Sequence, residues 1–521
     1  MDTQTIALRQ DRLVLSQCRI CRSRKVKFLI EFDERMSDGT RRKFFICKKC
    51  GTILDERGIA PDYEDGVPGT DVESFVKYSY EAGCCIHFNA LSVCLAREAL
   101  GDLRRENQAR FLDIGSGLGF SLIFAKKMGF SPIGVEPSPL NGIAQSTLGV
   151  EAIPDYLEKA DLPKKSFDIV HASEVIEHVQ DPRAFAGYAA SLLKDSGILV
   201  LTTPNAEVAA RGEKSKEKEW FEAYVPGHHL NILTSKALTN ILRDQGFNDI
   251  RVLALDGSSG KKRLMTVSSL KERVIMPLPS IDSLRSQARL LTDALLEELI
   301  AQKKSGQFNE WLYQGALFRL FEEYANRGDF EKAVKIELQL DALLASTGFK
   351  EESLEQVLCD TYEAYVSQVV AFVGMYMYLK GMLALNHKRD FGMARRKFEI
   401  AEHLFRVERS VRCYNPSRYE WPERARFCQG LAYLYAGLRE EALLVFDEIL
   451  KLRHGQLTPA LRRQIYANKG VAHLQKYDNV KAIEAFLRQI IIKPLPFREN
   501  REAIKNMRIA ILQIVRDFFD R

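Results

Sequence analysis

The sequence predicts a multidomain chain in which an α/β domain lies between a small cysteine-rich module and an all-α repeat region. Three observations predict this fold class. An apolar strand runs into the glycine-rich turn FLDIGSGLG (residues 111–119), two Cys-x-x-Cys pairs lie near the N-terminus, and small and aromatic residues recur at helical-hairpin spacing beyond residue 280. We expect domains over 1–60, 106–275 and 276–521, with a linker and lead-in helix over 61–105.

The length and composition set the bounds. A chain of 521 residues suggests about three domains. We expect no transmembrane helix, because no apolar run approaches about 18 residues, and the N-terminus lacks a signal-peptide pattern. A cytoplasmic protein is therefore expected. The net charge of +6 is mild, so nucleic acid stays open as a partner but is not favoured.

The N-terminal module carries four cysteines in two pairs, Cys18 with Cys21 and Cys47 with Cys50. Two thiolates three positions apart can clamp one metal ion, and a second pair completes a tetrahedron. Alternating segments at 25–32 and 40–46 predict two strands between the pairs, and we expect a core separate from that of the next domain. The pattern predicts a zinc ribbon with structural Zn²⁺; a redox dithiol or a chance spacing are the alternatives. Its basic side chains form either a solvated face or a grip on a phosphorylated substrate or RNA.

The glycine-rich turn follows a predicted buried strand over 109–114, near whose end Asp113 stands. Gly115, Gly117 and Gly119 let the backbone turn sharply and approach a ligand closely. A dinucleotide fingerprint would need a glycine where Phe120 stands. A carboxylate at the edge of the loop does not attract a negatively charged pyrophosphate. It does attract the positively charged sulfonium and ammonium groups of S-adenosylmethionine.

A second acid, Glu136, ends the next short apolar strand, over 132–135. In a doubly wound sheet, an acid at this place can accept hydrogen bonds from both ribose hydroxyls. The alternative is an ordinary tight turn with no ligand. An acid at the end of the strand that follows the glycine loop favours a cofactor site over an ordinary turn.

Residues 106–270 resemble the class I S-adenosylmethionine-dependent methyltransferases, and within them the ubiquinone-biosynthesis-type branch. Besides FLDIGSGLG and GVEP, the resemblance rests on LPKKSFDIVHASEVIEHVQDP, LLKDSGILVLTTPN and GHHLNILTSKAL. It implies a Rossmann-like seven-stranded sheet with further strands near 149–153, 167–172 and 198–202 and an edge hairpin over 250–255 and 263–268. It also implies that Asp155 with Tyr156 lies near the adenine ring. A polar run over 211–219 is either a loop covering the site or plain surface.

Methyl transfer needs positioning, and an oxygen, nitrogen or carbon nucleophile must also lose a proton. A histidine is the natural base. His178, which we expect in a helix opening at 174, and His229 match positions where the family usually has a histidine, while His171 is a third candidate and Glu174 a nearby carboxylate. The alternative is that these histidines cap or pack helices.

The C-terminal region carries an internal repeat. Tetratricopeptide spacing is shared by Gly430, Tyr433, Ala442 and Phe446, and in a second copy by Gly470, Ala482, Phe486 and Pro494. There are two poorer copies, one with Tyr324 and Ala333 and the other with Gly381, Ala394, Phe398 and Ala401. A plain helical bundle is the alternative. Stacked repeats offer a concave surface, which indicates a protein partner or a homodimer.

We therefore expect an S-adenosylmethionine-dependent methyltransferase acting on a small polar acceptor. The zinc module also resembles that of sugar-modifying C-methyltransferases, which favours a glycan or sugar precursor, although those enzymes continue into a further α/β domain. One alternative is a methyltransferase of RNA or protein. The other is a catalytically silent repeat scaffold that binds protein partners.

Overall fold

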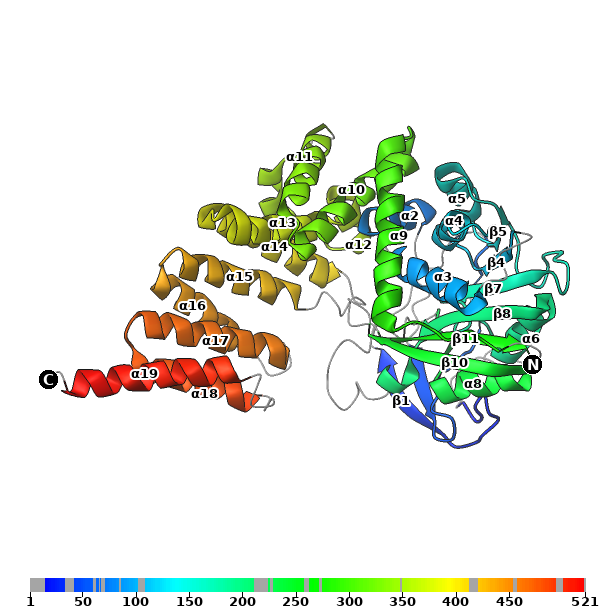
Figure 1. Ribbon diagram of the computed structural model, residues 1–521, viewed down its shortest axis with the longest axis horizontal. Coiled ribbons are helices and arrows are strands. Elements are labelled where there is room, and N and C mark those ends of the chain that lie inside the picture. Colours follow the sequence, from blue (N-terminus) through cyan, green and yellow to red (C-terminus); the bar gives the residue numbers. More distant parts are fainter. Residues whose placement is uncertain are drawn as a thin grey trace, which may run out of the picture. The chain divides into compact units, whose positions relative to one another are not determined.

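The computed structural model consists of two compact units, Met1–Ala316 and Leu317–Arg521, and each is described here by itself (Figure 1). The residues that it describes are 15–32, 42–59, 62–64, 66, 71–83, 86–101, 108–209, 224, 228–256, 262–270, 274–346, 349–411, 420–452, 457–492 and 500–519. The expected covering loop over 211–219 lies outside these residues.

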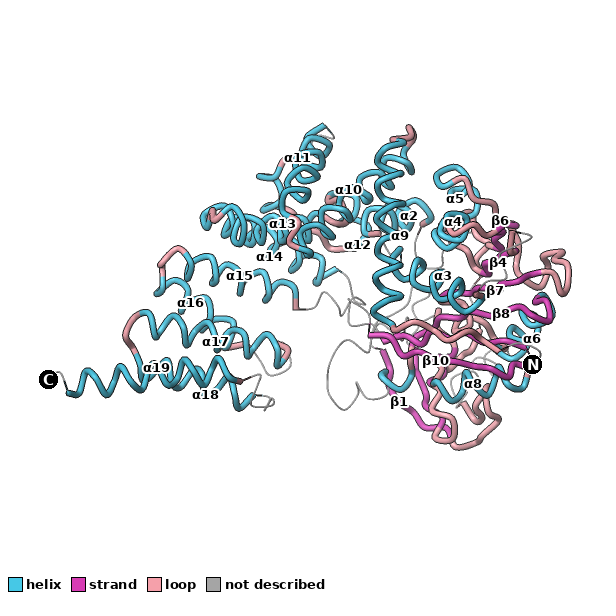
Figure 2. The backbone as a smooth tube through the Cα atoms, viewed as in Figure 1, coloured by secondary structure: helices cyan, strands magenta, loops and turns pink. Residues whose placement is uncertain are grey.

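The first unit is built on a seven-stranded sheet in the order β10-β11-β8-β7-β4-β5-β6 (Figure 2). The five strands from β8 to β6 run parallel, and the β10–β11 hairpin closes one edge antiparallel. This is the Rossmann-like seven-stranded sheet that the resemblance implies. The strands are β4 (Arg110–Ile114), β5 (Ser131–Val135), β6 (Ala152–Ile153), β7 (Phe167–Ser173), β8 (Leu193–Pro204), β10 (Phe247–Asp256) and β11 (Lys262–Leu270).

Helices lie along the sheet because parallel strands need crossover connections. α3 contacts β7, β8 and β11, and α9 packs against α3. The helices of this unit are α2 (Val72–Ala82), α3 (Ile86–Leu100), α4 (Phe120–Lys127), α5 (Leu140–Leu148), α6 (Pro182–Leu192), α8 (Ser235–Asp244), α9 (Ile281–Gln302) and the start of α10 (Gln307–Arg327). The sequence placed α9 with the repeats, whereas here it packs on the α/β unit; the domain bounds themselves stay a prediction.

Two local expectations differ from the structure. The third strand is only β6, because Gly149 takes a left-handed conformation with φ 65° and ends α5. Residues 174–178 form a turn rather than a helix opening. The helix begins later, at Pro182, where the Asp181 carboxylate accepts hydrogen bonds from the backbone N–H groups of Arg183 and Ala184.

The cysteine-rich module forms a second, antiparallel sheet in the order β1-β2-β3-β9, with β1 (Val26–Phe32), β2 (Arg42–Cys47), β3 (Ile53–Asp55) and β9 (Asn231–Ile232). The last strand comes from the α/β domain, about 180 residues further along the chain. One cluster of buried residues joins Cys18, Ile20 and Leu54 to Leu233 and Leu238. The expectation of a separate ribbon core was therefore wrong.

The second unit consists of helices, most of them paired as hairpins. They are α11 (Phe330–Ser346), α12 (Tyr362–Gln368), α13 (Val373–Leu383), α14 (Phe391–Val411), α15 (Trp421–Tyr435), α16 (Arg439–Leu450), α17 (Pro459–Gln475), α18 (Asn479–Ile492) and α19 (Arg501–Phe519), with the short turns η2 (Glu351–Gln356) and η3 (Ala384–Lys388). Among the helices in the described ranges, none combines the length and apolar composition that a bilayer crossing requires.

Three helical hairpins share the same contact between a glycine and a phenylalanine ring. A Cβ added to Gly381, Gly430 or Gly470 would lie 2.6, 2.4 or 2.5 Å from the ring of Phe398, Phe446 or Phe486 on the following helix. Each glycine therefore lets the two helix backbones approach around one aromatic ring. The repeat seen in the sequence is a repeat of this contact.

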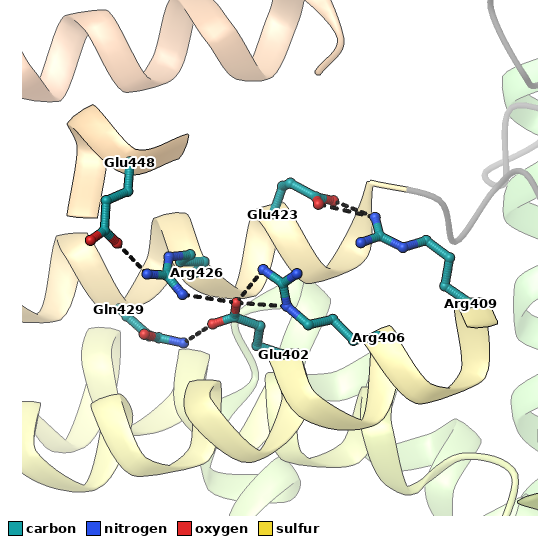
Figure 3. A network of polar contacts seen from close by, with 7 residues as sticks. All are labelled: Glu402, Arg406, Arg409, Glu423, Arg426, Gln429 and Glu448. Carbon is teal, nitrogen blue, oxygen red and sulfur yellow. Dashed lines mark hydrogen bonds and ion pairs between the residues drawn. The ribbon is translucent and has the colours of Figure 1, made fainter. Parts of the chain in front are cut away.

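A buried carboxylate joins successive helices of this unit (Figure 3). Glu402 on α14 accepts hydrogen bonds from Arg406, from Arg426 and from Gln429, at 2.7, 3.2 and 2.7 Å. Arg426 also pairs with Glu448 on α16. Because Glu402 is buried, these partners offset the cost of desolvating its charge.

Candidate functional site

The glycine loop connects β4 to α4 and has room on one side only. Gly115, Gly117 and Gly119 have φ values of 69°, 50° and 79°. A Cβ on Gly115 would lie 2.7 Å from Val175, and one on Gly119 2.5 Å from Val150, whereas one on Gly117 would meet nothing within 4 Å. Two glycines therefore allow close packing beneath the loop, and Gly117 faces open space.

Asp113 sits near the carboxyl end of β4, paired in register with Gly134 of β5 and His171 of β7. Its Oδ1 atom lies 2.6 Å from His171 Nδ1, and His171 Nε2 lies 2.8 Å from Ser92 Oγ on α3. Asp113 is 1% exposed, and its Oδ2 atom has no hydrogen-bond partner among the described residues. One carboxylate oxygen is thus held in place, while the other is buried without a hydrogen bond from the described residues.

Glu136 follows β5 and folds back over the loop. Its Oε2 accepts a hydrogen bond of 2.8 Å from Gly117 N, and its Oε1 accepts bonds from Ser138 N and Oγ. Burial raises the pKa of Glu136. The carboxylate is therefore placed beside the loop at the ends of the strands, where a doubly wound sheet binds ligands.

The chain reaches Asp155 and Tyr156 two and three residues after Ile153, whose carbonyl accepts a hydrogen bond from Glu136 N. Both residues therefore follow a strand end that lies beside Glu136. The Tyr156 hydroxyl donates to Asp62 Oδ1 at 2.7 Å and accepts from Tyr63 N at 2.8 Å. The segment 62–64 therefore lies over this end of the site. The sequence predicts only a linker here, because residues 59–69 are rich in Pro, Asp and Gly.

Two of the three candidate base histidines, His178 and His229, come together, whereas His171 is buried in contact with Asp113 and Ser92. The rings of His178 and His229 are 4.8 Å apart and perpendicular, and His228 lies 6.4 Å from His178. Tyr63 Oη is 3.0 Å from His178 Nδ1. Burial, followed by the neighbouring histidines, lowers the pKa of His178 well below 6.5, so this ring is neutral at pH 7.

Two carboxylates lie near the pair and differ in their surroundings. Glu177 is fully buried, 3.9 Å from His229 Nε2, and burial raises its pKa well above the usual value. Glu174 instead pairs with Arg263 at 2.6 Å and accepts from Thr202. The structure therefore places Glu174 in an ion pair with Arg263 of β11, whereas Glu177 lies beside the histidines.

Among the residues that the structure describes, two clusters could hold a metal ion. The sulfurs of Cys18, Cys21, Cys47 and Cys50 lie within 4.8 Å of one another, with 3.7 Å between Cys18 and Cys50. A tetrahedral Zn–S₄ site has sulfur–sulfur edges of about 3.8 Å. The pKa of the Cys18 thiol is raised by its hydrogen bond with Cys50 and by burial, and a divalent cation would remove that penalty.

The second cluster comprises Glu177, His178 and His229, whose ligand atoms also lie within 4.8 Å. A neutral imidazole can bind a metal as well as accept a proton. Reasoning from the sequence missed Tyr63 and Arg263. Neither carries a motif signal, because Tyr63 approaches His178 across 115 positions and Arg263 approaches Glu174 across 89.

Comparison with known proteins agrees with this fold. Residues 87–252 match the family model described as a methyltransferase domain. The chain is similar to the ubiquinone biosynthesis O-methyltransferase of Rhodopseudomonas palustris strain BisB5, at 40% identity over 102 residues, which is 18% of this chain and 40% of that protein. The protein of the same name from Bradyrhizobium sp. strain ORS 278 is 42% identical over 103 residues, with the same coverage.

The chain thus spans about two fifths of the length of these curated relatives. Among solved structures, a SAM-dependent methyltransferase from Thermotoga maritima is 23% identical and aligns with a TM-score of 0.29. The alignment covers 38% of this chain and 100% of that one.

Proposed function

We propose that this chain, whose residues 87–252 match the model of a methyltransferase domain, is a class I S-adenosylmethionine-dependent methyltransferase that transfers a methyl group to a small polar acceptor. The observation that carries the proposal is the open face of Gly117 beside Asp113, whose buried Oδ2 lacks a hydrogen bond within the described ranges. An unsatisfied buried carboxylate oxygen is costly, and a cationic ligand offsets that cost.

The residues present fit S-adenosylmethionine, which supplies a methyl group already activated by its sulfonium. Asp113 would bind the cationic part of the cofactor. Glu136 would accept from the ribose hydroxyls, and Asp155 with Tyr156 would border the adenine. The glycine loop would let the cofactor approach the backbone, and a Cβ at Gly117 would take up that space.

His178 and His229 are the candidate acceptor-side residues. A neutral His178 can accept a proton at Nε2 only if its Nδ1–H donates to Tyr63 Oη, 3.0 Å away. Tyr63 would then orient the ring, because its hydroxyl can accept from or donate to Nδ1 in either tautomer. Glu174, bound to Arg263, would hold the loop between β7 and the histidine turn rather than take the proton.

The acceptor is proposed by class. The curated relatives carry the name O-methyltransferase, which favours an oxygen as the accepting atom. We favour a hydroxyl on a small polar molecule, with glycans and sugar precursors as the first group to assay.

The flanking modules are assigned by their chemistry. We propose that the four clustered cysteines hold one structural zinc ion, since their spacing fits a Zn–S₄ tetrahedron. Their thiols are free, which suits a reducing cytoplasm. The Gly–Phe hairpins favour a tetratricopeptide-like stack that binds a protein partner or a second copy.

The test is methyl transfer from isotope-labelled S-adenosylmethionine into fractionated cell extract, with Asp113→Asn at a subsaturating cofactor concentration as the control that should transfer less label. Label in the small-molecule fraction supports the proposal. Label in RNA or protein assigns a macromolecular acceptor instead. Bound cofactor with no transfer to any fraction would indicate a silent scaffold.

A further inference from the structure

The segment that carries His229 is held on one side by the turn that carries His178. Leu230 N and Asn231 N both donate to Glu177 O, at 2.8 and 3.1 Å, and the Asn231 side chain donates to Val179 O at 2.9 Å. These bonds fix the register of the segment against the histidine turn. They leave the opposite side of the segment to the ribbon.

The ribbon holds that opposite side as an antiparallel strand pair. β3 pairs with β9 through Ile53 with Ile232 and Leu54 with Asn231, and Asp55 N donates to Leu230 O at 3.0 Å. The sheet of the cysteine module therefore ends on the residues that directly follow His229.

Arg19, which lies between Cys18 and Cys21, joins the knuckle to this strand pair. Its Nη2 donates to Asp55 O at 2.9 Å and to Leu230 O at 2.8 Å, and its Nε donates to Asn231 Oδ1 at 3.3 Å. A Cβ on Gly58 would lie 2.3 Å from Arg19 Nη1, so the guanidinium lies against that glycine. One nitrogen thus bonds carbonyls of both segments while a second bonds the Asn231 side chain, a set of directed donors that the single ammonium of a lysine does not reproduce.

The second knuckle holds the other end of the same segment. Thr234 Oγ1 donates to Cys50 O at 2.8 Å and also caps α8 by accepting from Ala237 N. Arg183 donates to Ile20 O from two nitrogens, at 3.2 and 3.1 Å. Residues inside or beside both Cys-x-x-Cys turns thus contact the segment or the helix that follows the histidine turn.

We propose that Arg19 is a positioning residue that couples the cysteine cluster to His229, so that filling the cluster with metal holds the acceptor-side histidine in place. The inference rests on the proposed role of His229. A bound metal fixes the two knuckles, and with them Arg19 and the Cys50 carbonyl. Asp113 and Gly117 are held by β5 and β7 instead, so the cofactor side should be insensitive to this coupling.

The test is carbethoxylation of histidines by diethyl pyrocarbonate in the full chain, read residue by residue by mass spectrometry. Arg19→Met is compared with Arg24→Met, which removes an exposed arginine of the same module. We expect Arg19→Met to raise the labelling rate of His229 roughly fivefold or more through local opening, with labelling of His473 in the other unit unchanged. Zinc content and S-adenosylmethionine affinity should stay within about twofold of wild type.

Removing zinc from the wild type should raise His229 labelling as Arg19→Met does, and doing both should add little, because both break one coupling. If Arg19→Met lowers the melting temperature, the same labelling experiment is done with Arg19→Lys. This variant keeps the positive charge and most of the aliphatic side chain and removes only the guanidinium donors. Unchanged His229 labelling in Arg19→Lys, or an equal rise at His473, overturns the proposal. Labelling needs no methyl transfer, so absence of cofactor binding in the wild type would overturn the proposed function alone.

Discussion

Replacing Asp113 by Asn should weaken S-adenosylmethionine binding while preserving the fold. The amide keeps the shape of the side chain and an oxygen that can face His171 Nδ1, now 2.6 Å from Oδ1. It removes the negative charge at Oδ2, which is buried and has no bond to any described residue. A hydrogen bond to a charged group contributes about 1.5–3 kcal/mol, so the dissociation constant should rise roughly 10- to 150-fold.

The assay is titration calorimetry with two ligands, S-adenosylmethionine and S-adenosylhomocysteine. Both carry the ammonium, and only the first carries the sulfonium. If Asp113 binds the ammonium, Asp113→Asn weakens both ligands equally; if it lies nearer the sulfonium, it weakens S-adenosylmethionine more.

Asp195→Asn, which removes an exposed carboxylate paired with Lys165, serves as the control for a change of net charge. Equal affinity of Asp113→Asn and wild type for both ligands, at an unchanged melting temperature, would refute the assignment of Oδ2 to the cofactor.

Three further expectations concern the other parts of the chain. Because burial lowers the pKa of His178, methyl transfer should stay flat through pH 7 and fall only at pH values well below 6.5. Stability should begin to decline at a higher pH, about 6.5, because the unfolded state binds protons there that the buried ring does not. A rate that already halves between pH 8 and 7 would contradict a neutral His178 base. Cys47→Ser should lower the zinc content measured by elemental analysis from one ion per chain, and a wild type purified without chelator that holds no metal would contradict the cluster assignment. Gly470→Ala should lower the melting temperature, because its Cβ would overlap the Phe486 ring at a cost of about 1–3 kcal/mol. Gly392→Ala, at an exposed position of α14, should not lower it. A higher melting temperature for Gly470→Ala would contradict this close contact between glycine and ring.

Local patterns were sufficient for the features whose partners lie close in sequence. FLDIGSGLG predicted β4, the turn and α4, because a buried strand, a positive-φ turn and a helix start each need particular residues at fixed spacing. The two Cys-x-x-Cys pairs predicted one cluster, and the recurring glycine and phenylalanine predicted the hairpin contacts. In each case the backbone geometry is encoded within about 40 residues.

Tertiary structure decided what the acceptor side looks like. His178 and His229 meet Tyr63, Glu177 rather than Glu174 lies beside them, and Arg19 reaches Leu230 across 211 positions. Such contacts depend on which strands and loops lie next to one another in space. A sequence pattern with a period of two or 3.6 residues does not contain that information. For this reason the sequence predicted a ribbon with its own core. In the structure, the small ribbon buries its apolar residues against β9 and the core of the α/β unit.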